Sequence, residues 1–315
     1  MTAPRTLRIS SRASALALGQ ARHVASLLAA VAPDTHVEIV HITTTGDSNQ
    51  VNTLRSFGGQ GVFTREVQRA VLDERADLAV HSLKDLPTQP TPGLQLAGVP
   101  PRAPTADALI APANAPAPLA LEQLPPQARV GTGSLRRQAQ LLHLRPDLRL
   151  SEVRGNVETR LRKLDEGEYD ALVLATAGLQ RLELAHRISL PLQPPVMFGA
   201  VGQGALGIEC REDADVARLL DQISCPLTRP AVVAERALLA TLRAGCHAPV
   251  GVDSRVLGAS LRLNAVVLNP TGTERLLAEI EGPLEHAPQL GARLAQDLLA
   301  QGADRLIHTT PAPSA

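Results

Sequence analysis

The N-terminal third of the chain alternates short apolar runs with stretches in which apolar residues recur at helical spacing. Strands are expected at Leu7–Ser10, His36–Ile42 and Leu78–His81. The intervening spacing predicts a helix that runs from a Ser14 cap through Ala32, and a second helix over Phe63–Arg75 with Thr64 as its cap. This strand–helix rhythm predicts a parallel sheet with helices on both faces.

A proline-rich stretch from Pro87 to Pro126 interrupts the rhythm, which then restarts. Two strands are expected within that stretch, at Leu94–Val99 and Ala108–Ile110. The restarted series consists of strand Arg129–Thr132, helix Ser134–Leu144, strand Leu148–Val153, helix Val157–Glu166, strand Ala171–Ala175 and helix Thr176–Leu182. A second proline-rich crossing follows at Pro191–Pro195. Two strand–helix series joined by two crossings predict two lobes around a cleft.

The rest of the chain has a different pattern. A glycine-rich strand is expected over Val201–Cys210, and the elements after it are helix Thr228–Leu242, strands Val250–Asp253, Leu257–Val267 and Glu274–Ile280, and helix Ala287–Leu299. Because these strands are not separated by helices, the pattern predicts a C-terminal α+β layer. With 315 residues, the chain is long enough for two or three domains.

Composition excludes several classes of partner. The formal net charge is zero and only 1% of residues are aromatic, whereas polynucleotide binders usually combine a basic excess with stacking aromatics. No apolar run approaches a membrane span, and no secretory signal is expected at the N-terminus. No His, Cys or carboxylate spacing resembles a metal site. Three cysteines with no Cys-x-x-Cys pair predict reduced thiols in a cytoplasm.

Arginines gather around two glycine-bearing turns in the middle of the chain. Arg136 and Arg137 follow the turn Gly131–Ser134, and Arg154 and Arg160 flank the next one. The turn ends a strand and opens a helix, so its N–H groups could bind an anion, although an ordinary capped turn fits equally well. Together the arginines favour a small ligand with several carboxylates or phosphates.

Three other residues are candidates for chemistry. Of the 31 basic residues only two are lysines, and one of them, Lys84, precedes Asp85 in a loop after a strand. Asp85 is either part of a surface ion pair or a carboxylate that stabilises a cation or moves protons. Cys246 lies in a glycine-flanked turn and is the cysteine most expected to be exposed, whereas a buried small residue is the simpler interpretation for Cys210 and Cys225.

Six ordered strings of the chain are similar to motifs of the porphobilinogen deaminase family, whose members are also called hydroxymethylbilane synthases. The strings are Arg8–Leu18, Ala79–Pro87, Gly131–Gln138, Arg154–Leu161, Leu174–Leu182 and Val201–Cys210. The resemblance runs from about Leu7 to Val250 and weakens through the C-terminal layer.

The resemblance implies an α/β fold with two periplasmic-binding-protein-like lobes around a cleft and a small C-terminal α+β domain. It predicts the first lobe at residues 1–100 and 200–222, the second lobe at 101–199, and the C-terminal domain, which carries the cofactor cysteine, at 223–315. It also implies a monomeric cytoplasmic enzyme whose partner is the small molecule porphobilinogen, with no nucleic acid, no membrane and no metal.

The resemblance implies a specific chemistry as well. In the family, a dipyrromethane cofactor is held by a thioether to the cysteine that matches Cys246. Four porphobilinogen molecules each lose ammonia, and the resulting methylene-pyrrole cation is attacked by the growing chain. The linear tetrapyrrole is then released by hydrolysis. Each pyrrole carries two carboxylates, so a six-ring chain carries about twelve negative charges, which arginines would bind.

The family's functional residues match particular positions here. The catalytic aspartate matches Asp85. The positions expected to bind the cofactor are Cys246, Lys84, Asp85, Thr132, Ser134, Arg136, Arg137, Arg154 and Gly155. The positions expected to bind substrate are Arg12, Ser14, Gln20, Arg154, Arg160, Arg181 and Gln203.

The chain departs from the family pattern at a few places. Gln60 stands where a lysine is common, Gly133 where a serine is common, and the cysteine loop has Ala244 where glycine is commoner. Two other classes fit the arginine pattern less well. A periplasmic-type binding protein would need an export signal, and a nucleotide-dependent enzyme with a P-loop would need a Gly-Lys-Ser/Thr string after the turn.

Overall fold

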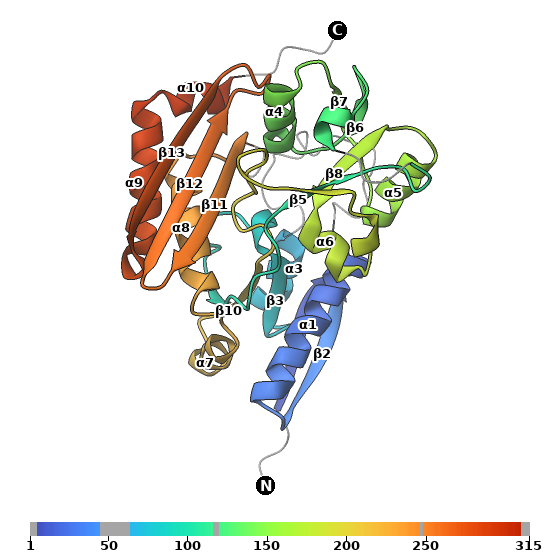
Figure 1. Cartoon of the computed structure of the whole chain (residues 1–315). Helices are drawn as coiled ribbons and strands as arrows, with labels where there is room; N and C mark the ends of the chain where they lie inside the picture. The colour runs from blue at the N-terminus through green and yellow to red at the C-terminus, as the bar shows by residue number, and fades with distance from the viewer. Residues whose placement is uncertain (1–4, 45–63, 116–119, 246–247, 310–315) are drawn as a thin grey trace. The chain divides into compact units, whose positions relative to one another are not determined.

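The computed structural model describes residues 5–44, 64–115, 120–245 and 248–309 (Figure 1). The chain divides into two compact units. One consists of Met1–Ala103 with Gly204–Arg229, and the other of Pro104–Gln203 with Pro230–Ala315. The chain therefore leaves the first unit within the first proline-rich stretch and returns to it after the second crossing.

The first unit is built on a five-stranded sheet. Its strands are β1 (Arg5–Arg12), β2 (Thr35–Ile42), β3 (Leu78–Ser82), β4 (Leu94–Gly98) and β10 (Leu206–Arg211), in the spatial order β2-β1-β3-β10-β4. β1 pairs in parallel with β2 and β3, but β10 is antiparallel to both of its neighbours. The predicted parallel pairing is therefore confirmed for β1, β2 and β3. β10 enters the sheet after the return crossing and runs in the opposite direction.

Helices cover both faces of this sheet, as predicted. α1 (Ala15–Val31) and α7 (Ala214–Gln222) share one apolar core with the sheet, and α3 (Arg65–Leu72) packs on the opposite face. The expected Ser14 cap is confirmed, since its Oγ accepts a hydrogen bond from the Ala17 amide. α3 is shorter than expected because Glu74 adopts a left-handed conformation with φ of 59°. α7, which the sequence pattern did not predict, begins at an Asp213 cap.

The second unit begins with a sheet of the same size. Its strands are β5 (Asp107–Ile110), β6 (Arg129–Gly131), β7 (Arg149–Ser151), β8 (Ala171–Ala175) and β9 (Leu190–Leu192), in the order β7-β6-β8-β5-β9. Its helices are α4 (Leu135–Leu144), α5 (Val157–Asp165) and α6 (Thr176–Arg181). β9 overlaps the start of the predicted second crossing, Pro191–Pro195. Pro191 is tolerated there because β9 is an edge strand.

The C-terminal layer of the second unit is a three-stranded antiparallel sheet with helices. It comprises α8 (Thr228–Thr241), β11 (Val250–Leu257), β12 (Ser260–Leu268), β13 (Arg275–Pro283), α9 (Ala287–Ala300) and α10 (Ala303–His308). The α+β prediction is confirmed, although the strand expected at Leu257–Val267 begins later. Gly258, with φ of 62°, makes the tight turn that separates β11 from β12.

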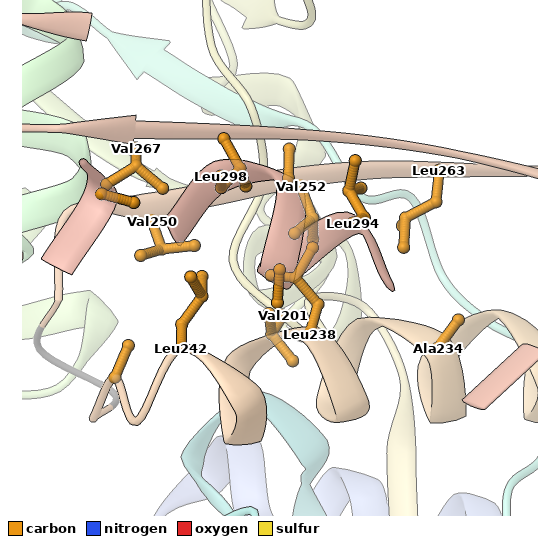
Figure 2. Packing of buried hydrophobic residues seen from close by; sticks show 14 of the residues in the cluster. Val201, Ala234, Leu238, Leu242, Val250, Val252, Leu263, Val267, Leu294 and Leu298 are labelled. Atoms are coloured by element: carbon orange, nitrogen blue, oxygen red, sulfur yellow. The ribbon is translucent and has the colours of Figure 1, made fainter. Parts of the chain in front are cut away.

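The alternation of β12 explains how this layer is attached. Leu261, Leu263, Ala265 and Val267 are buried with α8 and α9 in one core, in which Leu238 and Leu242 point toward the sheet (Figure 2). Val266 and Leu268 point to the other face and pack with Phe198 and with Ala139 of α4. The C-terminal layer therefore rests on the helix that carries Arg136 and Arg137.

Candidate active site

The loop after β3 presents the candidate aspartate. Leu83–Asp85 forms a short 3-10 turn in which Leu83 is buried, Lys84 is half-buried and Asp85 is exposed. The Leu83 amide donates to the Ala205 carbonyl at 3.0 Å. A Cβ at Gly207 would lie 2.7 Å from Leu83 Cδ1, so any side chain there would displace Leu83. Among the described residues, no ion pair involves the Asp85 carboxylate, which is exposed.

Candidate residues from β1 and α1 lie near the same end of the sheet. β1 and β3 are parallel neighbours, so Arg12, the last residue of β1, and Ser82, the last of β3, both lie at carboxyl ends of strands. Ser14 caps α1. Gln20 is buried and its Nε2 donates to Ser82 Oγ at 2.7 Å, which ties α1 to the residue before the Leu83–Asp85 turn.

A buried polar cluster that the sequence pattern did not single out lies in the sheet just before this loop. The side chains of His81 in β3 and Glu209 in β10 are both almost fully buried, with Nε2 and Oε2 3.1 Å apart. Gln68 of α3 donates to the same Glu209 oxygen at 2.8 Å. The cluster joins two strands and a helix and so anchors the strand that ends at the Leu83–Asp85 turn.

In the second unit, the glycine-bearing turn connects β6 to α4. A Cβ at Gly131 would lie 2.5 Å from Leu172 Cδ2 and 2.9 Å from Tyr169 Cδ1, so any side chain there would displace these two residues. Thr132 is buried, and its carbonyl accepts from Gln138 Nε2 at 2.9 Å. Ser134 is the first residue before α4, but its hydroxyl makes no capping hydrogen bond. The turn thus brings two hydroxyl side chains to the N-terminus of a helix.

Arg136 and Arg137 converge on one carboxylate, that of Asp107 at the start of β5. Arg136 Nη1 donates to Asp107 Oδ2 at 2.7 Å, and Arg137 donates to Oδ1 through Nε at 3.0 Å and Nη2 at 2.7 Å. Gln203 Nε2 donates to the same oxygen at 3.0 Å. Asp107 was not a predicted site residue. The sequence feature that could have identified Asp107 is its position as a single acidic residue within the apolar run Ala106–Ala111.

The electrostatics of this cluster follow from its burial. Asp107 is 0% exposed, and the arginines are 4% and 7% exposed. Burial alone would raise the pKa of the Asp107 carboxyl, but the two guanidinium groups outweigh burial and hold the pKa well below its ordinary value. Burial also lowers the pKa of Arg136, an effect that Asp107 partly offsets. Because arginine stays protonated, the three side chains carry one net positive charge.

Arg154, Arg160 and Arg181, which were also predicted to bind carboxylates, lie in the second unit as well. Arg154 Nη2 pairs with Glu152 Oε1 at 2.9 Å, and Arg160 Nε donates to the Gly155 carbonyl at 2.8 Å. Gly155 has φ of 105°, which only glycine adopts readily, and it begins the turn before α5. Arg181 ends α6, and burial lowers its pKa.

Two predicted positions lie outside the described residues, namely Cys246 and Gln60. Of the two other cysteines, Cys210 is buried and Cys225 is partly exposed. Within the described ranges, no group of three or more His, Cys, Asp or Glu side chains is arranged to hold a metal ion. None of the described helices has the length and apolar character needed to cross a membrane.

These features define a class of protein, an α/β chain of two compact units, one of which buries two arginines on a single carboxylate. Two family models match it. "Porphobilinogen deaminase, dipyromethane cofactor binding domain" matches residues 7–218, and "Porphobilinogen deaminase, C-terminal domain" matches residues 230–300. The chain belongs to the porphobilinogen deaminase family.

Curated relatives agree over nearly the full length. The porphobilinogen deaminase of Syntrophotalea carbinolica is 46% identical over 314 residues, covering 98% of both chains. That of Methylobacillus flagellatus is 44% identical over 312 residues, covering 99% of both. The solved structure of the methionine-binding protein MetQ is similar over 70% of this chain and 90% of that chain, with 14% identity and a TM-score of 0.45.

Proposed function

We propose that this enzyme is a hydroxymethylbilane synthase that joins four porphobilinogen molecules head to tail. Each substrate loses one ammonia, and one water enters when the linear tetrapyrrole is released. The observation that carries the proposal is the buried Arg136–Arg137–Asp107 cluster, with two guanidinium groups to one carboxylate, in a chain that matches the cofactor-binding domain of the family. A cluster of this charge suits carboxylates, of which every pyrrole ring of the substrate carries two.

The residues present fit a dipyrromethane cofactor. Its four carboxylates need cationic or N–H donors, and the second unit offers Arg136, Arg137, Arg154 and the hydroxyls of Thr132 and Ser134. Arg136 Nε is buried and has no hydrogen-bond partner among the described residues. A carboxylate oxygen of the cofactor would supply the acceptor that this N–H group needs. When bound, the cofactor supplies the free pyrrole α-carbon to which the first substrate is joined. Cys246 is the proposed point of attachment through a thioether.

Asp85 is the proposed catalytic residue. Its exposed carboxylate lies after β3, where it can accept hydrogen bonds from pyrrole N–H groups. A negative charge at that point stabilises the positive charge that develops when ammonia leaves the substrate. Lys84, Arg12 and Ser14 of the first unit are proposed to bind carboxylates of the substrate or cofactor, and Gln20 keeps Ser82 in place beside them.

The other arginines of the second unit extend the binding surface. Arg160 and Arg181 are proposed to bind substrate carboxylates. Gly155 is proposed to let the backbone approach the cofactor, and Gln203 is proposed to support the Asp107 cluster. We also propose a cytoplasmic monomer with lobes at residues 1–100 with 200–222 and at 101–199. The C-terminal domain would then span residues 223–315.

The intact mass of the purified protein tests the proposal. The wild type should be heavier than its sequence by one dipyrromethane. Cys246→Ser should lose both the extra mass and nearly all activity, whereas the matched variants Cys210→Ala and Cys225→Ala should keep the adduct. A wild type that is fully active but unmodified would refute it.

A further inference from the structure

Asp107 is a buried acidic side chain on which several donors of the second unit converge. It is wholly buried at the start of β5 and accepts four hydrogen bonds, from Arg136, from two nitrogens of Arg137 and from Gln203 (Figure 1 shows β5 and α4). These donors come from α4 and from the segment just before β10, so one carboxylate fixes side chains that are far apart in the sequence.

The two arginines use their nitrogens differently. Arg137 engages all three, with Nε and Nη2 on Asp107 and Nη1 on the Val173 carbonyl at 3.1 Å. Arg136 directs a single nitrogen, Nη1, at both Asp107 and the Phe198 carbonyl. Its Nε is buried without an acceptor among the described residues. A buried N–H without an acceptor is costly, so this nitrogen is the natural place for a ligand oxygen.

Asp107 also permits the two cations to lie side by side. They occupy consecutive positions of α4, and Asp107 is the one carboxylate that pairs with either of them in the described part of the chain. Without it, two buried guanidinium groups would repel each other and rotate apart. With it, a single positive charge remains to attract a carboxylate.

We infer that Asp107 is a positioning residue for this enzyme, because it holds Arg136 and Arg137 in one arrangement and leaves Arg136 Nε to bind a carboxylate of the pyrrole chain. The inference rests on the proposed function. Asp107 itself acts through the arginines and does not contact the substrate.

Asp107→Asn tests the inference, with Asp77→Asn as its matched control. Asp77 also accepts a two-nitrogen fork, from Arg8 Nε at 3.2 Å and Nη2 at 3.0 Å, but it lies in the first unit. Folded protein is first verified by circular dichroism. The fraction that carries the dipyrromethane mass is then measured, together with KM and kcat for porphobilinogen.

Asp107→Asn should lower the fraction of molecules that carry dipyrromethane. In the molecules that do carry it, KM for porphobilinogen should rise about tenfold to hundredfold, because one charge-assisted hydrogen bond to the substrate is misplaced. Asp77→Asn should lower stability alone and leave KM unchanged. A purely structural role for Asp107 would reduce the amount of active enzyme without changing KM.

If Asp107→Asn does not fold, Asp107→Glu decides, since it keeps the charge on a side chain one methylene longer. Reduced loading with a raised KM in Asp107→Glu supports the inference, and wild-type loading and KM overturn it. The proposed function is tested separately from the role of Asp107: it is refuted if the wild type itself carries no dipyrromethane.

Discussion

Gly272→Ala should weaken the attachment of the C-terminal layer to α4. Gly272 lies in the turn between β12 and β13 with φ of 72°, and a Cβ there would be 2.5 Å from the Ala139 carbonyl oxygen and 2.6 Å from the His143 amide nitrogen. His143 Nδ1 lies 2.9 Å from the Gly272 carbonyl oxygen. These contacts are with the backbone of α4, which cannot rotate out of the way.

The matched control is Gly258→Ala. Gly258 makes the other turn of the same sheet, with φ of 62°, but no atom lies within 4 Å of its added Cβ. Both substitutions force alanine into a left-handed conformation at about 1–2 kcal/mol. Only Gly272→Ala adds overpacking, which costs about 1–3 kcal/mol. The difference between the two variants isolates the contact with α4.

Thermal unfolding followed by circular dichroism measures this difference. For a unit of this size, 1 kcal/mol shifts Tm by roughly 2–4 °C, so Gly272→Ala should melt about 2–12 °C below Gly258→Ala. Since α4 carries Arg136 and Arg137, Gly272→Ala should also lower the fraction loaded with dipyrromethane, while Gly258→Ala should not. Equal melting temperatures in the two variants would refute the packing of this turn on α4.

Four further outcomes are expected. Asp85→Asn should slow porphobilinogen consumption by ~10²–10³ without lowering Tm, because Asp85 is exposed and its charge acts on the developing cation; a loss below about tenfold would favour a surface role. Burial raises the pKa of Cys210 to about 11, whereas at Cys225 burial is outweighed by hydrogen bonds at the start of α8 that lower the pKa. Since the thiolate is the reactive form, an alkylating reagent at pH 8 should modify Cys225 of the folded enzyme well before Cys210. If Cys246 holds a thioether, the unfolded, cofactor-loaded enzyme should react at two thiols rather than three. Mass spectrometry counts the labels in both experiments. Gly133→Ser, which restores the common family residue, should change stability by less than about 0.5 kcal/mol in a urea titration, because its Cβ would meet nothing closer than 3.5 Å; a loss above about 1 kcal/mol would mean that the turn is tighter than described.

Local patterns predicted the elements best where neighbouring residues determine them. Ser14 lies three residues before the amide that it caps, and the apolar spacing that follows it gave α1 nearly its full extent. The direction of β10 has no such local signal, because it depends on pairing with β3, more than a hundred positions earlier in the chain. The break between β11 and β12 was predicted a few residues too early, between Asp253 and Leu257, because a two-residue turn at Gly258 leaves the apolar alternation on either side almost uninterrupted.

The residues of the candidate site likewise fall into those that the sequence indicates and those that only the fold brings together. Arg136 and Arg137 could be identified from the sequence because their density beside a glycine turn is itself unusual. Their partner could not, since a lone aspartate in an apolar run indicates only that some cation must meet it after folding. The sequence likewise separates His81 from Glu209 by many positions, and only the pairing of β3 with β10 brings them together.

The geometry around Asp107 explains why a guanidinium is needed at position 136, beyond any general preference of this chain for arginine. One planar group has to contact Asp107 and the Phe198 carbonyl through Nη1 and still offer Nε in another direction. A lysine ammonium is a single point of charge, so it could satisfy the carboxylate and the carbonyl but would have no second nitrogen to present. In the proposed arrangement, charge attracts the ligand's carboxylates, and the planar group held by Asp107 determines where one of them binds.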